Sequence, residues 1–374
     1  MKVLVLGGCG AMGKAIVRDL NENPDVDGII IADIDLARAR AYAEEVGSQK
    51  ISVKKVDIKN RDQLAKVCNG VNVVANASWY EFNLDVMKAA LKAKAHYIDL
   101  GGLYHISKKQ LKLDKDFKNA GITAILGIGA SPGITNVLAG YGASKLDSVQ
   151  EVHIRTGAKG GGGFAYSAKT ILDEVTMNPV IFEKGKFKEV EPLSGKEHYR
   201  LPSPVDDVEG FYSIHSELAT LPLTIKGVKT VTFRVGFSTS LLQKVNVLLE
   251  LGLLNTAKVP IRGLKLSPKD FLYHYLGTLT APPSMDEFKA LQVEVGGKKD
   301  GARQTLRLET VVKSSKKWNL RATAIWTGVP AAIVTHWLGK GKILEKGVLP
   351  PEVGIDPEAF MSELAKRDIL ITQV

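Results

Sequence analysis

The first 35 residues carry a strand, a glycine turn and a helix in direct succession, and this unit constrains the rest of the chain. Residues 1–6 form an apolar run, and Gly8, Gly10 and Gly13 follow with the spacing G-x-G-x-x-G. Glycine at these positions lets a pyrophosphate approach bare backbone N–H groups at the positive end of a helix. Apolar residues at helical spacing come next. We therefore predict a dinucleotide-binding turn with cofactor contacts at Gly8, Gly10, Ala11, Met12 and Gly13.

The second apolar run indicates which dinucleotide is bound. It ends at Asp33, about 20 residues beyond Gly13, where a ribose-binding carboxylate is expected. A carboxylate there accepts hydrogen bonds from both ribose hydroxyls and repels the additional phosphate of NADP. We predict NAD as the cofactor, with NADP as the alternative because Arg38 is close enough in sequence to bind a phosphate. The structural alternative is a glycine turn that only packs a helix on a strand.

Apolar runs and helical segments alternate as far as residue 127, which predicts a doubly wound parallel sheet of the Rossmann type. In such a sheet, ligands bind beyond the carboxyl ends of the strands. Residues that follow the predicted strands should therefore share a rim with the glycine turn. The alternative for Asn76 and Ser78 is that their side chains only stabilise the turn and contact no ligand. Asp99 is expected to be a structural cap. The predicted rim contacts are Asp57, Asn76, Ala77, Ser78, Gly101, Gly102 and Ser131.

The composition limits the class of protein. The net charge is +10, but the lysines are scattered without aromatic residues between them, which indicates a solvated basic surface and no nucleic-acid partner. No run of 18 or more apolar residues occurs and the chain begins with a strand, so neither a membrane span nor a signal peptide is expected, and we predict a cytoplasmic protein.

The two cysteines, Cys9 and Cys68, are too few for a disulfide scaffold or a cysteine metal site, and no metal is expected. Each is expected to be a small buried residue. For Cys9 the alternative is a thiolate, because it lies in the phosphate turn at a helix N-terminus.

The pattern changes from residue 149 onward. Short alternating strands replace the βα pattern, and a glycine run at 160–163 marks a flexible segment. Residues 187–190, 230–235, 290–295 and 305–312 read as strands, and 167–176 and 240–251 as helices. We expect an α+β domain built on a mostly antiparallel sheet.

Several segments together resemble the saccharopine dehydrogenase family over nearly the whole chain. They are the glycine turn, HYID at 96–99, GASPGITN at 129–136, HSEL at 215–218 and GVLPPE at 347–352. The resemblance implies a Rossmann domain over 1–135, a substrate-binding and dimerisation domain over 136–325, and C-terminal helices over 326–374 that return to the first domain. It also implies a homodimer or higher homo-oligomer.

One departure from the family pattern affects the expected substrate. Saccharopine reductases carry an acidic residue before the Pro-Gly, where this chain has Ser131. Lysine 6-dehydrogenase-like members also lack it. The resemblance therefore favours an NAD(P)-dependent L-lysine 6-dehydrogenase, which oxidises a side-chain amine through an imine. The alternatives are a saccharopine or carboxynorspermidine dehydrogenase and, in another class, a non-catalytic NAD-binding sensor.

Amine oxidation needs a base, because hydride leaves the carbon only when the nitrogen is unprotonated. We predict His215 and Glu217 as a catalytic pair, since alternation places both on one face; a histidine that caps a helix is the alternative. Lys169 is predicted to hold a substrate carboxylate, or else to form a surface ion pair with Asp173 one helical turn away. Further candidates for an amino-acid substrate are Asn136, which also suits helix stabilisation, and the possible carboxylate clamps Arg155 and Arg234.

Overall fold

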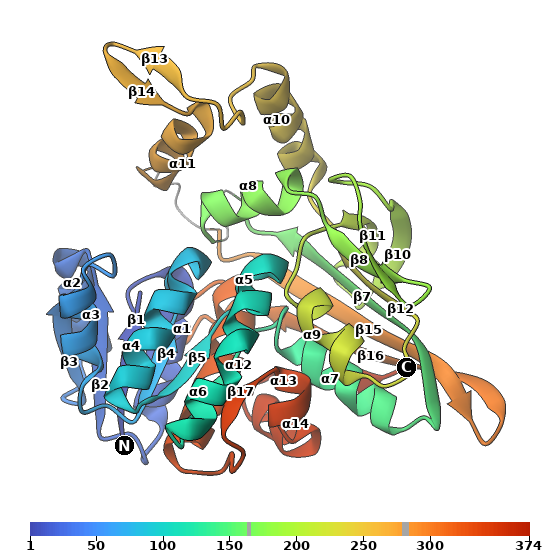
Figure 1. The fold of residues 1–374 in the computed structure, drawn as a ribbon, viewed down its shortest axis with the longest axis horizontal. Helices are drawn as coiled ribbons and strands as arrows, with labels where there is room; N and C mark the ends of the chain where they lie inside the picture. Colours follow the sequence, from blue (N-terminus) through green and yellow to red (C-terminus); the bar gives the residue numbers. More distant parts are fainter. Residues whose placement is uncertain (163–165, 279–283) are drawn as a thin grey trace.

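Seven parallel strands build the first sheet in the part of the chain that the computed structural model describes, residues 1–162, 166–278 and 284–374. Their order is β17-β6-β5-β4-β1-β2-β3, so the direction of winding reverses between β1 and β4 (Figure 1). The predicted doubly wound sheet is confirmed, with a seventh strand contributed by the C-terminal region. The strands are β1 Lys2–Leu6, β2 Gly28–Asp33, β3 Ile51–Lys55, β4 Val73–Asn76, β5 His96–Asp99, β6 Thr123–Ile125 and β17 Gly347–Leu349.

The helices between these strands follow the apolar periodicity of the sequence. Residues 107–119 do not form a single helix, because a 3-10 turn separates two short α-helices there. Leu111 and Leu113 both pack on the core, and a continuous α-helix would place residues two apart on opposite sides. The elements are α1 Ala11–Glu22, α2 Leu36–Val46, α3 Arg61–Cys68, η1 Tyr80–Phe82, α4 Asn83–Ala93, α5 Leu103–Gln110, η2 Leu111–Leu113 and α6 Asp114–Asn119.

The C-terminal helix α12 (Ala322–Gly339) packs directly against α1, the helix that follows the glycine turn. It is apolar on nearly every side and almost entirely buried, as such a helix must be. Gly328 allows the close approach, because a Cβ there would lie 2.5 Å from Cβ of Ala15 and 2.7 Å from the carbonyl oxygen of Met12. The cofactor helix is therefore supported by the last part of the chain.

The second sheet runs in the order β10-β11-β12-β7-β15-β16-β18, with β8 and β9 joined to β12. All its pairs are antiparallel except β7 with β12, so the expected mostly antiparallel sheet is confirmed. The strands are β7 Ser148–Gly160, β8 Val180–Glu183, β9 Lys186–Glu189, β10 Glu197–Leu201, β11 Asp206–Tyr212, β12 Thr230–Val235, β15 Glu287–Lys299, β16 Ala302–Lys313 and β18 Thr372–Gln373.

The two faces of this sheet have different environments. The inner face, which carries Ile154, Phe233 and Val293, packs against helices on the side of the first domain (Figure 1). The outer face is partly covered by the β10–β11 hairpin. The helices that complete the structure are α7 Ile134–Ser144, α8 Ala168–Thr176, α9 Glu217–Thr224, α13 Pro351–Gly354 and α14 Pro357–Ala365.

A projecting arm stands above the second sheet and consists of α10 (Thr239–Glu250), the hairpin β13 (Val259–Ile261) and β14 (Leu264–Leu266), and α11 (Pro268–Thr278) (Figure 1). The sequence predicted α10 but not the hairpin or α11.

The chain crosses between the two sheets more than once. After the second sheet it returns through α12 and β17 to the first domain, and β18 then pairs with β16 of the second sheet. The boundaries 1–135, 136–325 and 326–374 stay a prediction. Of the expected flexible run, Gly160 ends β7 and Gly163 lies outside the described residues. No helix among the described residues is both long enough and apolar enough to cross a bilayer.

Replacing Gly328 by alanine tests the packing of α12 on α1. Because one obstructing atom is the backbone oxygen of Met12, we expect overpacking to cost about 1–3 kcal/mol of unfolding free energy, measured by urea denaturation. Gly28→Ala is the matched control, since its nearest neighbour is a side-chain carbon of Lys2 at 3.5 Å. Equal stability of the two variants would contradict this account of the helix contact.

Candidate functional site

The glycine turn is shaped to receive a phosphate group. A Cβ at Gly13 would collide with the carbonyl of Gly7, so this glycine brings the helix onto the strand. At Gly10 only one atom, the oxygen of Gly7, lies within 4 Å of the added carbon, at 3.1 Å, and the space is otherwise open. Gly10 is the N-cap of α1, with no side-chain cap and no acidic residue in the first turn. The N–H of Gly10 itself donates to the carbonyl of Gly7 at 2.9 Å, and the N–H groups of the first turn of α1 are suited to bind the pyrophosphate of a dinucleotide.

The carboxyl ends of β2 and β3 carry the polar groups that are expected to bind the adenosine part of a dinucleotide. Asp33 is the last residue of β2 and accepts a hydrogen bond from the backbone N–H of Asp35 at 3.1 Å. Arg38 donates to the carbonyl of Cys9 at 2.8 Å, which places its guanidinium against the glycine turn. The Asp57 carboxylate accepts from the N–H of Lys59 at 3.0 Å in its own loop.

Cys9 is buried in the turn. Burial, reinforced by the neighbouring Asp33, raises the pKa of the Cys9 thiol to about 12. It is therefore a neutral buried thiol, and the thiolate alternative is wrong.

The loop after β4 is held by its own side chains. Asn76 is buried and donates to Oδ1 of Asn83 at 2.9 Å, while its Oδ1 accepts from the hydroxyl of Ser78 at 2.6 Å. The carbonyl of Ala77 lies beside Gly7, so this loop adjoins the glycine turn. The geometry shows turn chemistry for Asn76 and Ser78, and their contact with a cofactor remains a prediction.

The loop after β5 is organised by a buried carboxylate. Asp99 accepts hydrogen bonds from the N–H groups of Gly101 (2.9 Å) and Gly127 (2.8 Å) and from the amide of Gln110 (2.5 Å). This is the structural cap that the sequence suggested. Gly102 N–H donates to the hydroxyl of Ser216 at 3.2 Å, which joins the loop to the second domain.

Glu217 gathers three side chains at the junction of the two domains. Its Oε2 lies 2.5 Å from Nδ1 of His215, and its Oε1 accepts hydrogen bonds from the hydroxyls of Ser131 (2.8 Å) and Thr135 (2.7 Å). The ring of His215 stacks on Phe233 with centroids 3.9 Å apart. Among the described residues none hydrogen-bonds to Nε2 of His215, which is buried. The structure thus brings His215 and Glu217 together, although Glu217 begins helix α9 instead of lying in a strand.

The electrostatics of this pair favour its charged form. Burial opposes protonation of His215, but the charge and hydrogen bond of Glu217 outweigh it and raise the pKa of His215 above its usual value. Burial likewise acts to raise the pKa of Glu217, and the adjacent His215 more than offsets this and lowers that pKa. We infer an imidazolium hydrogen-bonded to a carboxylate. Ser131, which was predicted to contact the cofactor, orients this carboxylate.

Two further ionisable groups were not predicted as site residues. Glu174 interacts electrostatically with His215, and Lys289 interacts with Glu174. Glu174 is buried and accepts from the hydroxyl of Tyr166 at 2.5 Å; burial raises its pKa. Lys289 lies on the inner face of β15, where burial lowers its pKa against the raising effect of Glu287 and Glu174. Lys289 could have been found from the sequence, because it occupies an inward position in a strand whose residues alternate between the two faces.

Lys169 does not pair with Asp173. It forms an ion pair with Glu81 of η1 and lies 5.6 Å from the ring centroids of Tyr80 and Tyr273. Asp173 is buried and accepts from the hydroxyls of Tyr80 (2.9 Å) and Tyr273 (2.6 Å). The alternative of a surface ion pair is therefore wrong, because both side chains are engaged between the first domain and the arm.

Asn136 and the two arginines are bound to other groups of the protein. Asn136 is buried, accepts from the N–H of Gly133 at 3.1 Å and donates to Glu352 at 2.9 Å, which matches the helix-stabilising alternative. Arg155 and Arg234 both bind Glu197 on the outer face of the sheet. Because Phe233 points inward, its neighbour Arg234 points outward and cannot reach a substrate at His215. Arg155 and Arg234 could bind a substrate carboxylate only at a site separate from the one around His215.

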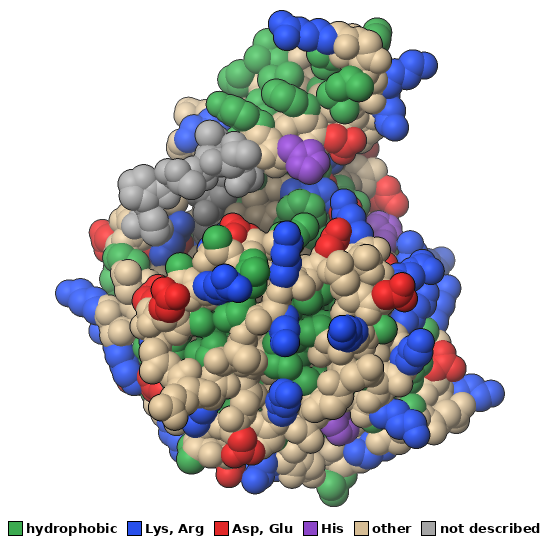
Figure 2. Space-filling view, turned by 90° about the vertical axis from the view of Figure 1, so that its left-hand side faces the viewer, with side chains coloured by type: hydrophobic (Ala, Val, Ile, Leu, Met, Phe, Trp, Pro, Cys, Tyr) green, Lys and Arg blue, Asp and Glu red, His purple; other side chains and the backbone are tan. Residues whose placement is uncertain are grey.

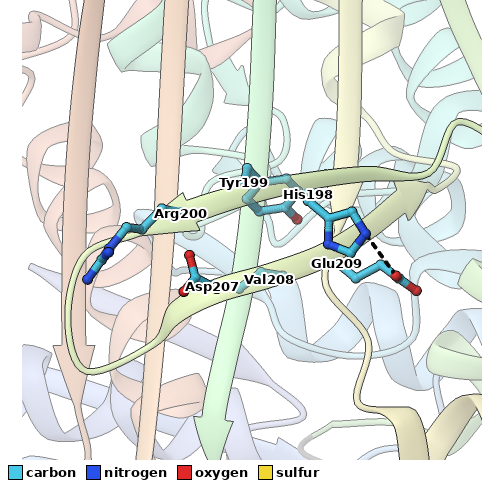
Figure 3. Close-up of a pocket in the computed structure, with 6 residues that line it drawn as sticks. All are labelled: His198, Tyr199, Arg200, Asp207, Val208 and Glu209. Carbon is cyan, nitrogen blue, oxygen red and sulfur yellow. Dashed lines mark ion pairs between the residues drawn. The ribbon is translucent and has the colours of Figure 1, made fainter.

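The outer face also carries a hollow of about 500 Å³ on the β10–β11 hairpin (Figure 3). Its lining comes from this single hairpin and includes His198, which lies 3.2 Å from Glu209. It shares no residue with the junction around Glu217. The hollow is lined by His198, Tyr199, Arg200, Asp207, Val208 and Glu209.

Comparison with known proteins accounts for both domains. Residues 3–125 match the saccharopine dehydrogenase NADP binding domain, and residues 129–370 match the saccharopine dehydrogenase C-terminal domain. The fold is similar to that of apo saccharopine dehydrogenase (L-Glu forming) from Saccharomyces cerevisiae, with a TM-score of 0.74 over 100% of this chain and 99% of that chain at 19% identity.

Two curated relatives match almost end to end. Carboxyaminopropylagmatine dehydrogenase of Synechocystis is 26% identical over 98% of this chain and 96% of its own length. Carboxynorspermidine synthase of Vibrio cholerae is 26% identical over 97% of this chain and 94% of its own length. With both domains matched, the chain belongs to the saccharopine dehydrogenase family, as an NAD(P)-dependent oxidoreductase that acts on amine groups.

Proposed function

We propose that this enzyme interconverts an imine and a secondary amine that joins an amino-acid-like half to a cationic amine half. The observation that carries the proposal is the buried imidazolium–carboxylate pair of His215 and Glu217, which lies where the exits of the parallel sheet meet the second domain. A bound nicotinamide supplies the hydride donor or acceptor at this rim. The protein's own groups must then hold the amine and move its protons.

His215 is suited to move a proton at Nε2. When an amine adds to an aldehyde, the resulting hydroxyl leaves as water only after it is protonated, and an imidazolium donates that proton. In the reverse direction, neutral His215 takes a proton from the water that attacks the imine. Glu217 holds the ring through Nδ1 and stabilises its charged form in both directions.

The surroundings of the junction suit a cationic substrate. Carboxylates of Glu174, Asp173 and Glu81 lie on α8 and η1, next to the rings of Tyr80 and Tyr273. Ammonium and guanidinium groups bind to carboxylates and to aromatic faces. Lys289, Lys169 and Lys269 are cationic side chains in the same region. Lys169 and Lys269 already pair with Glu81 and Asp173, so Lys289 best suits the carboxylate of the amino-acid half. A carboxylated polyamine carries both kinds of group.

The names of the relatives support this class of substrate. Carboxyaminopropylagmatine and carboxynorspermidine each combine a carboxylate with a chain that bears several nitrogens. L-lysine 6-dehydrogenase is the second candidate. It is favoured by Ser131, which stands where saccharopine reductases carry an acidic residue.

A substrate screen separates these candidates. Purified enzyme with NAD or NADP should produce NAD(P)H absorbance with carboxynorspermidine or carboxyaminopropylagmatine, and much less with L-lysine. Saccharopine serves as the family control with a second amino-acid half. Turnover of L-lysine alone would replace the proposal by the second candidate, and cofactor binding without turnover of any amine would indicate a non-catalytic sensor.

Glu217→Gln tests the proton donor. Without the carboxylate charge, burial dominates and lowers the pKa of His215, so the imidazolium is lost at a lower pH. We expect kcat for imine reduction to fall by about 100-fold or more at neutral pH, and the alkaline limb of its pH profile to move toward acid. Ser131→Ala is the control, because it removes one hydrogen bond and keeps the charge. An unchanged pH profile in Glu217→Gln would remove His215 from proton transfer.

The preference for NAD over NADP is also proposed, from Asp33. Asp33→Ala should raise KM for NAD by about tenfold and leave KM for NADP nearly constant, because only NAD offers both ribose hydroxyls to the carboxylate. Arg38→Gln is the matched variant and should weaken NADP alone. If Asp33→Ala leaves KM for NAD unchanged, Asp33 does not contact the ribose.

A further inference from the structure

Lys169 of α8 holds its ammonium against three aromatic rings. Its Nζ lies 5.9 Å from the ring centroid of Trp79 and 5.6 Å from the centroids of Tyr80 and Tyr273. The carboxylate of Glu81 forms an ion pair with the same nitrogen. Proteins that recognise alkylammonium ligands use the same elements, several aromatic faces and a nearby carboxylate. We call Trp79, Tyr80, Glu81 and Tyr273 the cation cage.

The cation cage joins the first domain to the arm. Residues 79–81 follow β4, in the loop that adjoins the glycine turn, whereas Tyr273 belongs to α11 of the arm. Figure 2 shows acidic and basic side chains together in the band where the projecting part meets the body of the molecule. Asp173 accepts hydrogen bonds from the hydroxyls of both cage tyrosines, at 2.9 Å and 2.6 Å, and so fixes the two rings. The cage is therefore held in place by contacts that do not involve Lys169.

A row of carboxylates connects the cage to His215. Glu174 is 5% exposed and interacts electrostatically with His215, and Asp173 beside it is equally buried. The Lys169 side chain, one helical turn away from Asp173, is 16% exposed, and that of Glu81 is 48% exposed. Exposure thus rises from the imidazole to the cage, so the row has a buried inner end and an accessible outer end.

Ion pairs occupy the outer part of this row. Lys169 neutralises Glu81, and Lys269 lies 3.1 Å from Asp173. Glu174 forms no ion pair with any residue that the structure describes. A cation brought to the cage would meet the like charge of Lys169 and compete with it for Glu81. The native protein therefore offers Glu174 alone to the cationic half of an amine.

We propose, on the basis of the function given above, that Lys169 determines which amines the enzyme accepts. By filling the cation cage, it limits the amine half of the substrate to one cationic group beyond the reacting nitrogen, bound at Glu174. From Lys169 to Glu174, α8 rises by roughly 7.5 Å, a distance that a short alkyl chain between two nitrogens spans. With the lysine charge removed, a longer polyamine would place one cation at Glu174 and the next in the cage.

Isothermal titration calorimetry of the full chain tests this proposal with spermidine, a triamine, and with diaminopropane as the shorter probe. Lys169→Met removes the charge and keeps an apolar side chain of similar length. We expect this variant to bind spermidine at least about tenfold more tightly than the native protein, because the third nitrogen gains the cage. Binding of diaminopropane should change little, since its second nitrogen reaches only Glu174.

Three further variants separate the cage from a general effect of charge. Lys145→Met removes a lysine with the same kinds of contact elsewhere, because its Nζ lies 4.5 Å from the ring centroid of Tyr141 and 3.5 Å from Glu358. Lys169→Arg keeps the charge in the cage. Both should bind spermidine as the native protein does. Adding Trp79→Ala to Lys169→Met should abolish most of the gain, and circular dichroism verifies that every variant is folded.

Inhibition kinetics connect the cage to catalysis. In the oxidation of carboxynorspermidine with NAD or NADP, spermidine should be a competitive inhibitor whose inhibition constant falls by at least about tenfold in Lys169→Met, while kcat stays nearly constant. A native enzyme that turns over no amine would refute the proposed function, and calorimetry would still decide whether the cage binds a cation.

The proposal is overturned if Lys169→Met binds spermidine no more tightly than Lys145→Met. It is also overturned if both amines gain equally, or if the gain survives Trp79→Ala. Either of these results would reflect the loss of a positive charge anywhere on the surface.

Discussion

The structure depends on a buried carboxylate, Glu217, whose partners come from both domains. Ser131 and Thr135 belong to the loop and helix that leave the parallel sheet, whereas His215 precedes α9 of the second domain. A buried charge without partners is costly, and removing one member of a buried pair typically costs about 3–5 kcal/mol. The contact between the two domains therefore helps to satisfy the buried carboxylate that favours protonation of His215. A movement that separated the domains would take the Ser131 and Thr135 hydroxyls away from Glu217, whereas His215, two residues away in the same domain, would stay paired with it.

Other buried carboxylates join distant segments in the same way. Glu287 of β15 binds Arg321 at 2.6 Å and the N–H of Thr323 at the start of α12, so the second sheet fixes the helix that supports the cofactor turn. Glu352 accepts from Asn136 at 2.9 Å and from Thr224 at 2.9 Å, which ties the C-terminal segment to α7 and α9. These contacts explain why the chain crosses between the sheets. At each crossing a buried carboxylate accepts hydrogen bonds, from the N–H of Thr323 at the N-terminus of α12 in one case and from the side-chain amide of Asn136 in the other.

Elements set by local periodicity could be predicted from the sequence, whereas features formed where distant segments meet could not. The glycine turn, α2 and β12 were predictable because their apolar periods are unambiguous. The hairpin of the arm was missed because its pattern has no core to face within one chain. Lys289 was missed because a single inward lysine does not indicate a site in the sequence. Its interaction with Glu174 becomes apparent only in the folded structure. Arg155 and Arg234 suited a carboxylate by chemistry, yet strand alternation turns both toward Glu197 on the opposite face.

The departure at Ser131 becomes intelligible once the fold is known. Family members with an acidic residue at this position carry a carboxylate on the loop itself, whereas here the loop carries a hydroxyl. That hydroxyl donates to Glu217, so a carboxylate still lies at the rim, held by a helix of the second domain and already paired with His215. A carboxylate neutralised by an imidazolium is a poor partner for a substrate ammonium but a good support for a proton donor. Of the carboxylates on the other side of the junction, Glu81 and Asp173 are likewise paired, with Lys169 and Lys269, so the proposed recognition of a cationic substrate rests on Glu174 of α8.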